Sequence, residues 1–408
     1  MATDGNASLI RAYRADHGRI LAALIGQFRD FDLAEDALAE AFGRAAELWP
    51  KDPPRNPAGW LLTVARNIAL DWVRKTARRN RPDLLAAAAD FATPQPEAEP
   101  RIDEVADDRL RLIFTCCHPA LSQEAQVALT LKTLAGLTVT EIARAFVIAP
   151  GALARRLTRA KAKIRDAGIP YQVPQARDLP ERLPQVLAVI YLIYNEGYAA
   201  TEGRDLTRAD LAEEAIRLAR LLHGLLPDPE VQGLLALLLH HDARRPARSD
   251  AASAVITLEN QDRRKWDRTR MAEARGHLLR ALEARRPGPY QIQAAISALH
   301  NEAPSWGETD WSQIAGLYAA LEVQAPNPVV TLNRAVAVLE TGALETATNL
   351  IASVAEALQD YLPFYIARAE LHRRRAAPKA ARADLTRAVA LSRNAAETDF
   401  LTARIAAL

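Results

Sequence analysis

The stretch LTVTEIARAFVIAPGALARRLTRAKAKIR, from Leu137 to Arg165, decides what kind of domain this chain contains. Thr138 and Glu141 have the three-residue spacing of a capping box, which predicts that a helix begins there. Pro150 suits the first turn of a second helix, because a residue in that turn has no intrahelical amide partner to lose. The stretch therefore predicts two short helices joined by a turn at 147–149.

The second predicted helix has an apolar face and a basic face. At about 100° per residue, one stripe that must face the core contains Leu153, Leu157, Ala160 and Ile164. The opposite side and its edges carry Gly151, Arg155, Arg156, Thr158, Arg159, Lys161, Lys163 and Arg165. No acidic residue occurs from 142 to 165. A solvated basic helix is the alternative, but the paired helix and turn favour a helix-turn-helix that contacts DNA.

Length and composition limit the class of protein. A chain of 408 residues is expected to form about two to four domains. Its hydrophobic content of 49% is enough to give them packed cores. Lys and Arg number 52 against 50 for Asp and Glu, so any nucleic-acid surface must come from local clusters. Cys116 and Cys117 are the only cysteines, and neighbouring cysteines rarely pair, so no disulfide framework is expected.

The sequence has no export or membrane signal. No basic stretch followed by an apolar core occurs at its start, and no run approaches about 18 consecutive apolar residues. We expect a soluble cytoplasmic protein with no membrane contact.

Helical periodicity runs through nearly all of the chain, so an all-α fold is expected. The expected parts are helical blocks at 8–80 and 109–168, a flexible linker at 81–108, a helical middle domain at 175–290 and helical repeats at 291–408. From 82 to 108 the linker has eight acidic residues and Arg101 as its only basic one. It is either a solvated spacer or an acidic strap that occupies a basic channel of a partner.

The C-terminal part contains a repeat of 34 residues. Small residues recur at equivalent positions, with Ala335 matching Ala369 and Ala347 matching Ala381. Such residues let the two helices of a tetratricopeptide (TPR) unit approach closely. A weaker unit is expected before these two, although Asn301 interrupts its small-residue pattern.

The first 168 residues resemble bacterial extracytoplasmic-function (ECF) sigma factors. FDLAEDALAEAFGRAAELWP and NPAGWLLTVARNIALDWVRKTARR resemble conserved regions 2.2 to 2.4, and the helix-turn-helix resembles region 4.2. FTCCHPALS, YLIYNEGYAA, LLLHHDARR and NQDRRKW resemble the subgroup with a long C-terminal extension that carries TPR-like repeats. The resemblance implies a promoter-specificity factor, regulated through this extension, without enzymatic activity or cofactor.

The resemblance also implies the partners and the residues that bind them. Core RNA polymerase would be bound through its β′ coiled coil and β flap, and promoter DNA at its −10 and −35 elements. The residues expected to face the β′ coiled coil are Glu35, Asp36, Glu40 and Arg44. Those expected to contact the −10 element are Thr63, Arg66, Asn67, Arg74, Lys75 and Arg78.

Within the −10 set, Asn67 matches a position that helps to hold an unstacked base, and the cluster of basic residues favours phosphate contact. Trp60 and Trp72 could stack on bases, although tryptophans at helical spacing more often belong to a core. In the recognition helix, Arg155 and Arg159 are expected to read guanine edges of the −35 element. Ala149 stands at the cap position where many relatives have a hydroxyl, which leaves the start of this helix less firmly fixed.

Several other residues suggest sites of other kinds. Cys116, Cys117 and His118 lack the second cysteine pair of a zinc site, so a structural role and no bound metal are expected. His240 and His241 are adjacent, and their side chains diverge by about 100° on a helix, so they are not expected to share a ligand. Polar residues amid apolar helical runs favour a structural network over a small-molecule site. These residues are Asn195, Glu196, Asp242, Asp262 and Arg263.

Two other classes of function remain open. The chain could be a repressor or activator that acts without core polymerase, or an enzyme or ligand sensor with its site in residues 175–290. What the extension binds, whether protein or ligand, is not fixed by its fold.

Overall fold

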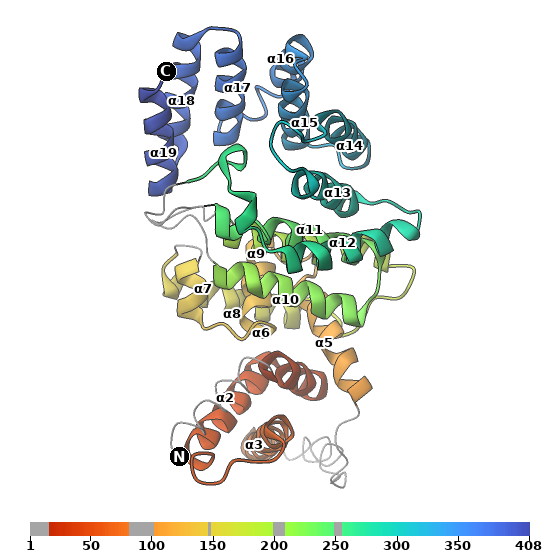
Figure 1. Ribbon diagram of the computed structural model, residues 1–408. Helices are drawn as coiled ribbons and strands as arrows, with labels where there is room; N and C mark the ends of the chain where they lie inside the picture. Colours follow the sequence, from red (N-terminus) through yellow and green to blue (C-terminus); the bar gives the residue numbers. More distant parts are fainter. Residues whose placement is uncertain (1–15, 81–101, 146–147, 199–208, 249–254) are drawn as a thin grey trace. The chain divides into compact units, whose positions relative to one another are not determined.

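The computed structural model describes residues 16–80, 102–145, 148–198, 209–248 and 255–408 (Figure 1). These residues form helices joined by loops and short 3-10 turns, with no β-sheet among them, which confirms the predicted all-α class. The chain divides into two compact units, residues 1–144 with 148–189, and residues 190–408 with 145–147. None of the described helices has both the length and the apolar character needed to cross a membrane.

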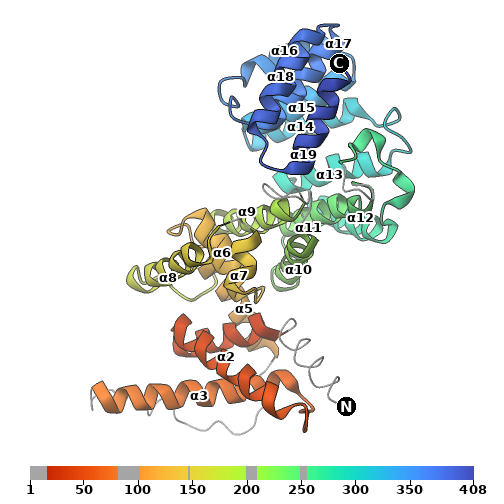
Figure 2. The same cartoon turned by 90° about the vertical axis from the view of Figure 1, so that its left-hand side faces the viewer.

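The first unit contains two groups of helices. Residues 16–28 form a helix that leads into α2. The next helices are α2 (Phe31–Leu48), α3 (Pro57–Asn80), α5 (Ile102–Cys116), α6 (Gln123–Thr133), α7 (Val139–Ala145), α8 (Pro150–Asp166) and the first part of α9 (Leu179–Tyr198). Helices α2 and α3 lie side by side in both views (Figures 1 and 2). Buried alanines such as Ala41 and Ala65 let their backbones approach closely.

The end of the expected linker is helical. Residues 81–101 lie outside the described part of the chain, but α5 begins at Ile102, inside the 81–108 segment predicted to be a flexible linker. The sequence IDEVADD at this point is rich in acidic residues, and negative charge favours the N terminus of a helix. The prediction of a linker through residue 108 therefore placed the start of the helix too late.

The second unit is built around α11 (Pro229–Asp242). Residues on every side of α11 are buried, as expected of a helix that packs against several others, here α10, α12 and α13. Gly233 permits the closest approach, because a Cβ added there would lie 2.7 Å from the backbone nitrogen of Gln291. The other early elements are α10 (Ala209–Leu225), η1 (Arg245–Ala247), η2 (Leu258–Asn260), η3 (Arg263–Lys265), α12 (Arg268–Glu283) and α13 (Pro289–Glu302).

The rest of the second unit consists of antiparallel helices. They are α14 (Trp311–Gln324), α15 (Pro328–Glu340), α16 (Leu344–Ser353), α17 (Leu362–Arg374), α18 (Pro378–Leu391) and α19 (Ala395–Ala406). Helices α17 and α18 each begin 34 residues after α15 and α16. The four alanines of the repeat, Ala335, Ala347, Ala369 and Ala381, are 0–2% exposed. Asn301 interrupts the pattern because its amide donates to the carbonyl of His240, at 3.0 Å.

Candidate DNA and polymerase interface

Local hydrogen bonds fix the start of the helix-turn-helix. The backbone nitrogen of Thr138 donates to Glu141 Oε2 at 2.7 Å, and the nitrogen of Glu141 donates to Thr138 Oγ1 at 3.2 Å. This reciprocal pair is the capping box predicted from the spacing of the two residues. It anchors the N terminus of α7, the helix that precedes α8 in the chain.

Helix α8 has the predicted two faces. Leu153, Leu157, Ala160 and Ile164 are its buried residues, as the periodicity predicted. Its N-cap residue, Ala149, makes no side-chain hydrogen bond to the helix, so Pro150 alone favours the first turn. The absence of a capping hydroxyl noted in the sequence is thus a feature of the folded helix.

Most of the predicted DNA-reading residues of α8 are accessible. Gly151, Arg155, Thr158, Arg159 and Lys163 are exposed. Arg156 is half-buried. An added Cβ at Gly151 would meet only the guanidinium of Arg155, at 3.7 Å, so the backbone has open space there. The side chains of Arg155 and Arg159 therefore project from the outer face without a carboxylate partner among the described residues.

Lys161 has a different environment. Its Nζ lies 2.9 Å from Asp32 Oδ1 and 2.8 Å from Glu35 Oε2, and its side chain is only 12% exposed. A residue expected to contact DNA thus pairs with Glu35, which is expected to contact polymerase. These two residues are more than a hundred positions apart in the sequence, so no local pattern could have predicted their contact.

The other predicted contacts on α2 and α3 are arranged as follows. Asp36, Glu40 and Arg44 are exposed on α2, and Arg44 Nε lies 3.2 Å from Glu40 Oε1. On α3, Thr63, Asn67 and Lys75 are exposed, Arg66 and Arg74 are half-buried, and the side chain of Arg78 lies outside the described part. Arg74 also pairs with Asp71 at 3.8 Å.

The two tryptophans near the predicted −10 surface are not free rings. Trp60 packs edge-on against the buried Trp49, with ring centroids 5.6 Å apart, and is half-buried. Trp72 is also half-buried. Both belong at least partly to the α2–α3 core, which leaves the exposed Asn67 as the better candidate for base contact.

The adjacent cysteines pack inside the first unit. Cys116 Sγ lies 3.3 Å from Thr133 Oγ1, and Cys117 Sγ lies 3.7 Å from Thr130 Oγ1. Burial raises the pKa of the Cys117 thiol to about 12, and it also raises the pKa of Cys116. Both thiols are therefore protonated at neutral pH and poorly suited to metal binding or nucleophilic attack. In the described residues, no three His, Cys, Asp or Glu side chains form a group that could hold a metal ion.

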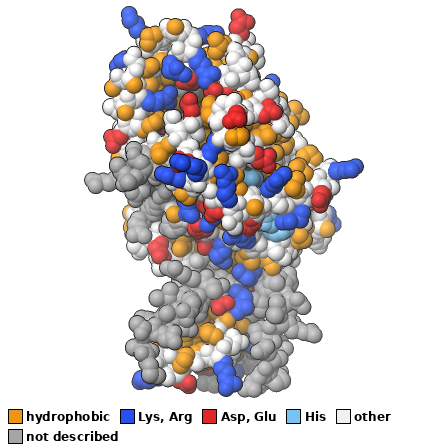
Figure 3. All heavy atoms as spheres, viewed as in Figure 1, with side chains coloured by type: hydrophobic (Ala, Val, Ile, Leu, Met, Phe, Trp, Pro, Cys, Tyr) orange, Lys and Arg blue, Asp and Glu red, His pale blue; other side chains and the backbone are white. Residues whose placement is uncertain are grey.

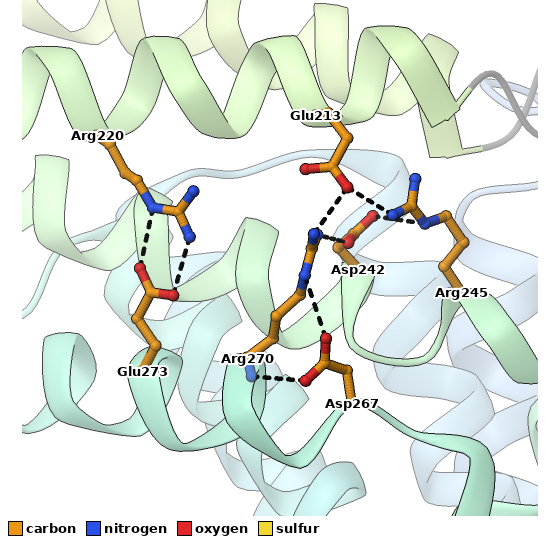
Figure 4. Close-up of polar contacts among 7 residues, drawn as sticks. All are labelled: Glu213, Arg220, Asp242, Arg245, Asp267, Arg270 and Glu273. Atoms are coloured by element: carbon orange, nitrogen blue, oxygen red, sulfur yellow. Dashed lines mark hydrogen bonds and ion pairs between the residues drawn. The ribbon is translucent and has the colours of Figure 1, made fainter.

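Asp242 and Asp262, two of the polar residues singled out in the middle of the chain, have different partners. Asp242 is paired with Arg245 and Arg270 (Figure 4). Asp262 pairs with the exposed Arg264 instead. His240 and His241 bind different partners, Asn301 and Ser297, in agreement with their predicted divergence. Of the arginines near these acids and histidines, only Arg263 was singled out from the sequence. The density of Arg and His in LLLHHDARR and NQDRRKW was the signal that could have pointed to the others.

Comparison with known proteins matches three parts of the chain. Residues 9–79 match sigma-70 region 2, and residues 111–164 match sigma-70 region 4. A probable ECF RNA polymerase sigma factor, SigI, of Mycobacterium tuberculosis is 26% identical over 167 residues, 41% of this chain and 57% of that protein. This chain belongs to the ECF sigma factors. Residues 182–282 of this sigma factor match a family of unknown function, DUF6596.

Other relatives cover different shares of this sigma factor. An uncharacterized protein of Rhizobium meliloti is 45% identical over 385 residues, 93% of this chain and 91% of that protein. A probable RNA polymerase sigma factor, RfaY, of Xanthomonas campestris pv. campestris is 30% identical over 162 residues, 38% of this chain and 39% of that protein. No solved structure matches. As a sigma factor the protein is a transcription initiation factor rather than an enzyme, and core RNA polymerase and promoter DNA are its partners.

Proposed function

We propose that this sigma factor reads the −35 element with α8 and the −10 element with α3 when core RNA polymerase holds both helices on DNA. The observation that carries the proposal is the outer face of α8, where Arg155, Thr158 and Arg159 are exposed above a fully packed inner stripe. A helix anchored on one side and basic on the other can lie in the major groove.

The residues of α8 divide into two roles. Arg155 and Arg159 lie one turn apart on the outer face and can pair bidentately with guanine edges. Arg156 and Lys163 lie at the margins of that face, where phosphate contacts supply affinity without sequence preference. Since Ala149 leaves the start of α8 uncapped, contacts near Gly151 are assigned to positioning rather than to base reading.

Helix α3 is proposed to hold the opened −10 element. Thr63 and Asn67 are exposed one turn apart, so they can share one strand of DNA. Arg66, Arg74, Lys75 and Arg78 are proposed to contact its phosphates. On α2, Asp36, Glu40 and Arg44 are exposed and are proposed to meet the β′ coiled coil, while the helix-turn-helix meets the β flap.

Binding to polymerase is proposed to separate α2 from α8. Lys161 forms ion pairs with the carboxylates of Asp32 and Glu35. While these pairs are present, Lys161 cannot contact DNA and Glu35 cannot contact polymerase. In the holoenzyme Glu35 would contact polymerase instead of Lys161. Lys161 would then contact DNA phosphates instead of the two carboxylates. Such an exchange makes DNA binding weak in the free protein and strong in the holoenzyme.

Regulation is proposed to act through the C-terminal extension, with the TPR-like helices α15 to α18 as a docking surface. A truncation after Arg165 would remove the extension, but it would also remove Tyr171, so a loss of activity could not be assigned to the extension alone. Tyr171 belongs to the first unit, where its Oη lies 2.8 Å from the carbonyl oxygen of Ala22 and 3.1 Å from that of Asp108. Substitutions within the full-length extension avoid the loss of this residue.

The decisive experiment compares two substitutions on α8. Promoters are first selected from a random DNA library with core polymerase and the full-length protein, and run-off transcription is then measured on selected and scrambled sequences. Arg159→Ala should lower transcription from the selected promoters by roughly tenfold or more, because one bidentate base contact discriminates by about 1–3 kcal/mol. Lys163→Ala should weaken binding on all sequences and reduce its salt dependence.

The same assay can refute the proposal. If the protein neither binds core polymerase nor supports transcription from any selected sequence, it does not act as a promoter-specificity factor. Equal effects of the two substitutions on selected and scrambled DNA would refute the assignment of base reading to Arg159.

A further inference from the structure

Tyr198, at the end of α9, lies between two arginines and a histidine of the second unit. The Cζ of Arg248 is 3.6 Å from the centre of the Tyr198 ring, and Arg248 also donates to the Tyr198 carbonyl. Arg244 Nη2 lies 3.5 Å from Tyr198 Oη. The ring of His241 is 5.4 Å away. These contacts bring two guanidinium groups onto one aromatic residue.

A third arginine, Arg263, extends this group toward α13. It donates to the carbonyl oxygens of His300, at 2.5 Å, and Ala303, at 2.7 Å. His300 lies 5.2 Å from the ring of Trp311. The positive charges of Arg244 and Arg263 both lower the pKa of His300, so both arginines lie within electrostatic range of this side chain. We call Arg244, Arg248 and Arg263 the arginine cluster.

The arginine cluster makes no ion pair with an acidic side chain of the described residues, although Asp242 and Glu308 lie near enough to raise the pKa values of Arg248 and Arg263 in part. Across the described residues, no carboxylate lies within ion-pair distance of any of its three members. Asp242, only two residues before Arg244, is instead held by Arg245 and Arg270. Unpaired charges are costly to bury, and Arg244 is buried while Arg248 and Arg263 are half-buried, so their gathering in one place needs a physical explanation.

Several buried polar atoms around the cluster also lack a partner. Arg244, His240 and Asn301 are 6%, 2% and 2% exposed. The atoms without a hydrogen bond are Arg244 Nε, Arg263 Nη2, His240 Nε2, His300 Nδ1, Tyr194 Oη and Asn301 Oδ1. Buried polar groups in folded proteins are nearly always hydrogen-bonded. Most of these atoms are donors or can become donors, so an acceptor bound here could satisfy several of them at once.

The electrostatic potential at the cluster is positive. Burial alone would raise the pKa of Tyr198, but the nearby guanidinium groups of Arg244 and Arg248 outweigh burial and lower it. Burial and Arg244 lower the pKa of His240 to about 4, and burial, Arg244 and Arg263 lower that of His300 to about 3. Both imidazoles are therefore neutral at pH 7 and can donate a hydrogen bond without adding charge.

We propose that the arginine cluster is the binding site of a small phosphate ester, which makes the extension of this sigma factor a metabolite sensor. A guanidinium fork matches phosphate oxygens bidentately, and a phosphate dianion neutralises more of the three charges than a single carboxylate can. Neutral imidazoles and tyrosine hydroxyls supply further donors. The proposal concerns the second unit alone and does not depend on how α3 and α8 read a promoter.

Binding of pyrophosphate and inorganic phosphate to the full-length protein tests the proposal. Calorimetry and thermal unfolding are measured at constant ionic strength, with citrate as a polycarboxylate and chloride as the background anion. Pyrophosphate should bind and raise the unfolding temperature, since a ligand of the folded state stabilises it. Arg244→Met and Arg248→Met should each weaken binding by about tenfold or more.

Arg264→Met is the matched control, because the Arg264 side chain is 90% exposed and already paired with Asp262. This variant should bind pyrophosphate as the unmodified protein does. Without ligand, Arg244→Met should fold as well as the unmodified protein, since it removes an unpaired buried charge. Failure of both phosphate probes to bind the unmodified protein, unchanged binding to Arg244→Met, or binding of citrate alone would each overturn the proposal.

Discussion

Two groups of arginines in the second unit are neighbours in sequence and opposite in environment. Arg245 and Arg270 lie among the carboxylates of Glu213, Asp242 and Asp267, at distances that include 2.6 Å from Arg245 to Glu213 (Figure 4). The arginine cluster, which begins one residue before Arg245, has no carboxylate within reach in the described residues.

The difference shows that the second unit pairs some of its partly buried arginines with carboxylates, and that these pairs join its helices. The paired network joins α10, α11 and the start of α12, and burial of Arg270 is outweighed by its acidic partners, so its pKa is raised. Acidic and basic side chains are interspersed over the visible face of α10 to α12 (Figure 3). At the arginine cluster no such carboxylate is paired among the described residues, which is the difference that the proposed phosphate site would account for.

The largest expected effect comes from breaking the paired network with the substitution used on the cluster. Arg270→Met should destabilise α11 and α12 by about 3–5 kcal/mol, because Asp242, whose side chain is 1% exposed, would keep only Arg245. Hydrogen exchange of the backbone amides of α11 measures this loss. Arg244→Met should show no comparable loss, and equal losses in the two variants would remove the distinction between the groups.

Glu273→Gln serves as the control for a pair at the surface. Glu273 binds Arg220 at 2.9 Å, but their side chains are 34% and 46% exposed. Solvent screening limits such a pair to less than about 1 kcal/mol. If Glu273→Gln loses more stability than this, the exposure of an ion pair does not predict its contribution to the stability of this unit.

A smaller effect is expected from the histidine beside the cluster. The pKa of His240 is about 4 in the folded protein and near 6.5 when unfolded, so its contribution to stability is complete above pH 6.5. That contribution is lost as pH falls toward 4, by about 1.4 kcal/mol at pH 5.5. His240→Gln should therefore lose less stability between pH 7 and 5.5 in chemical denaturation. Parallel pH profiles would contradict the assignment of a neutral, buried imidazole.

The smallest expected effect is on polymerase binding and extends the comparison to the first unit. The side chains of Lys161 and Glu35 are only 12% and 18% exposed, while that of Asp32 is 64% exposed. Lys161→Ala should therefore cost more stability than the surface pair of Arg220 and Glu273 and less than Arg270→Met. It should also tighten binding to core polymerase by a few-fold, because Glu35 no longer exchanges partners. Titration of labelled protein with core polymerase measures this change. Lys163→Ala, at an exposed position on the same helix, should leave core binding unchanged.

Much of the first unit could be predicted because its signals are local. The capping box of Thr138 and Glu141 and the buried stripe of α8 depend on spacings of three and four residues, which the sequence displays directly. The same holds for the 34-residue repeat, whose alanines are buried. The start of α5 was placed too late because prolines and acidic residues looked like a continuous linker.

Other features could not be predicted because they join distant positions. The ion pair between Lys161 and Glu35 links residues from two helices with no shared local pattern. The arginine cluster combines side chains from the segment after α11 and from η3, and two of them meet Tyr198 at the end of α9. A sequence shows that arginines are abundant there, but not which of them have carboxylates.

The sequence alone determined the helical class, the helix-turn-helix and its outer face, because hydrophobic periodicity and capping act over a few residues. Only the tertiary structure decided which charges are satisfied. Asp242 and Arg244 are two residues apart, yet within the described part of the chain Asp242 forms ion pairs with two arginines and Arg244 forms none. Charge balance depends on distances between elements that the chain brings together only when it folds.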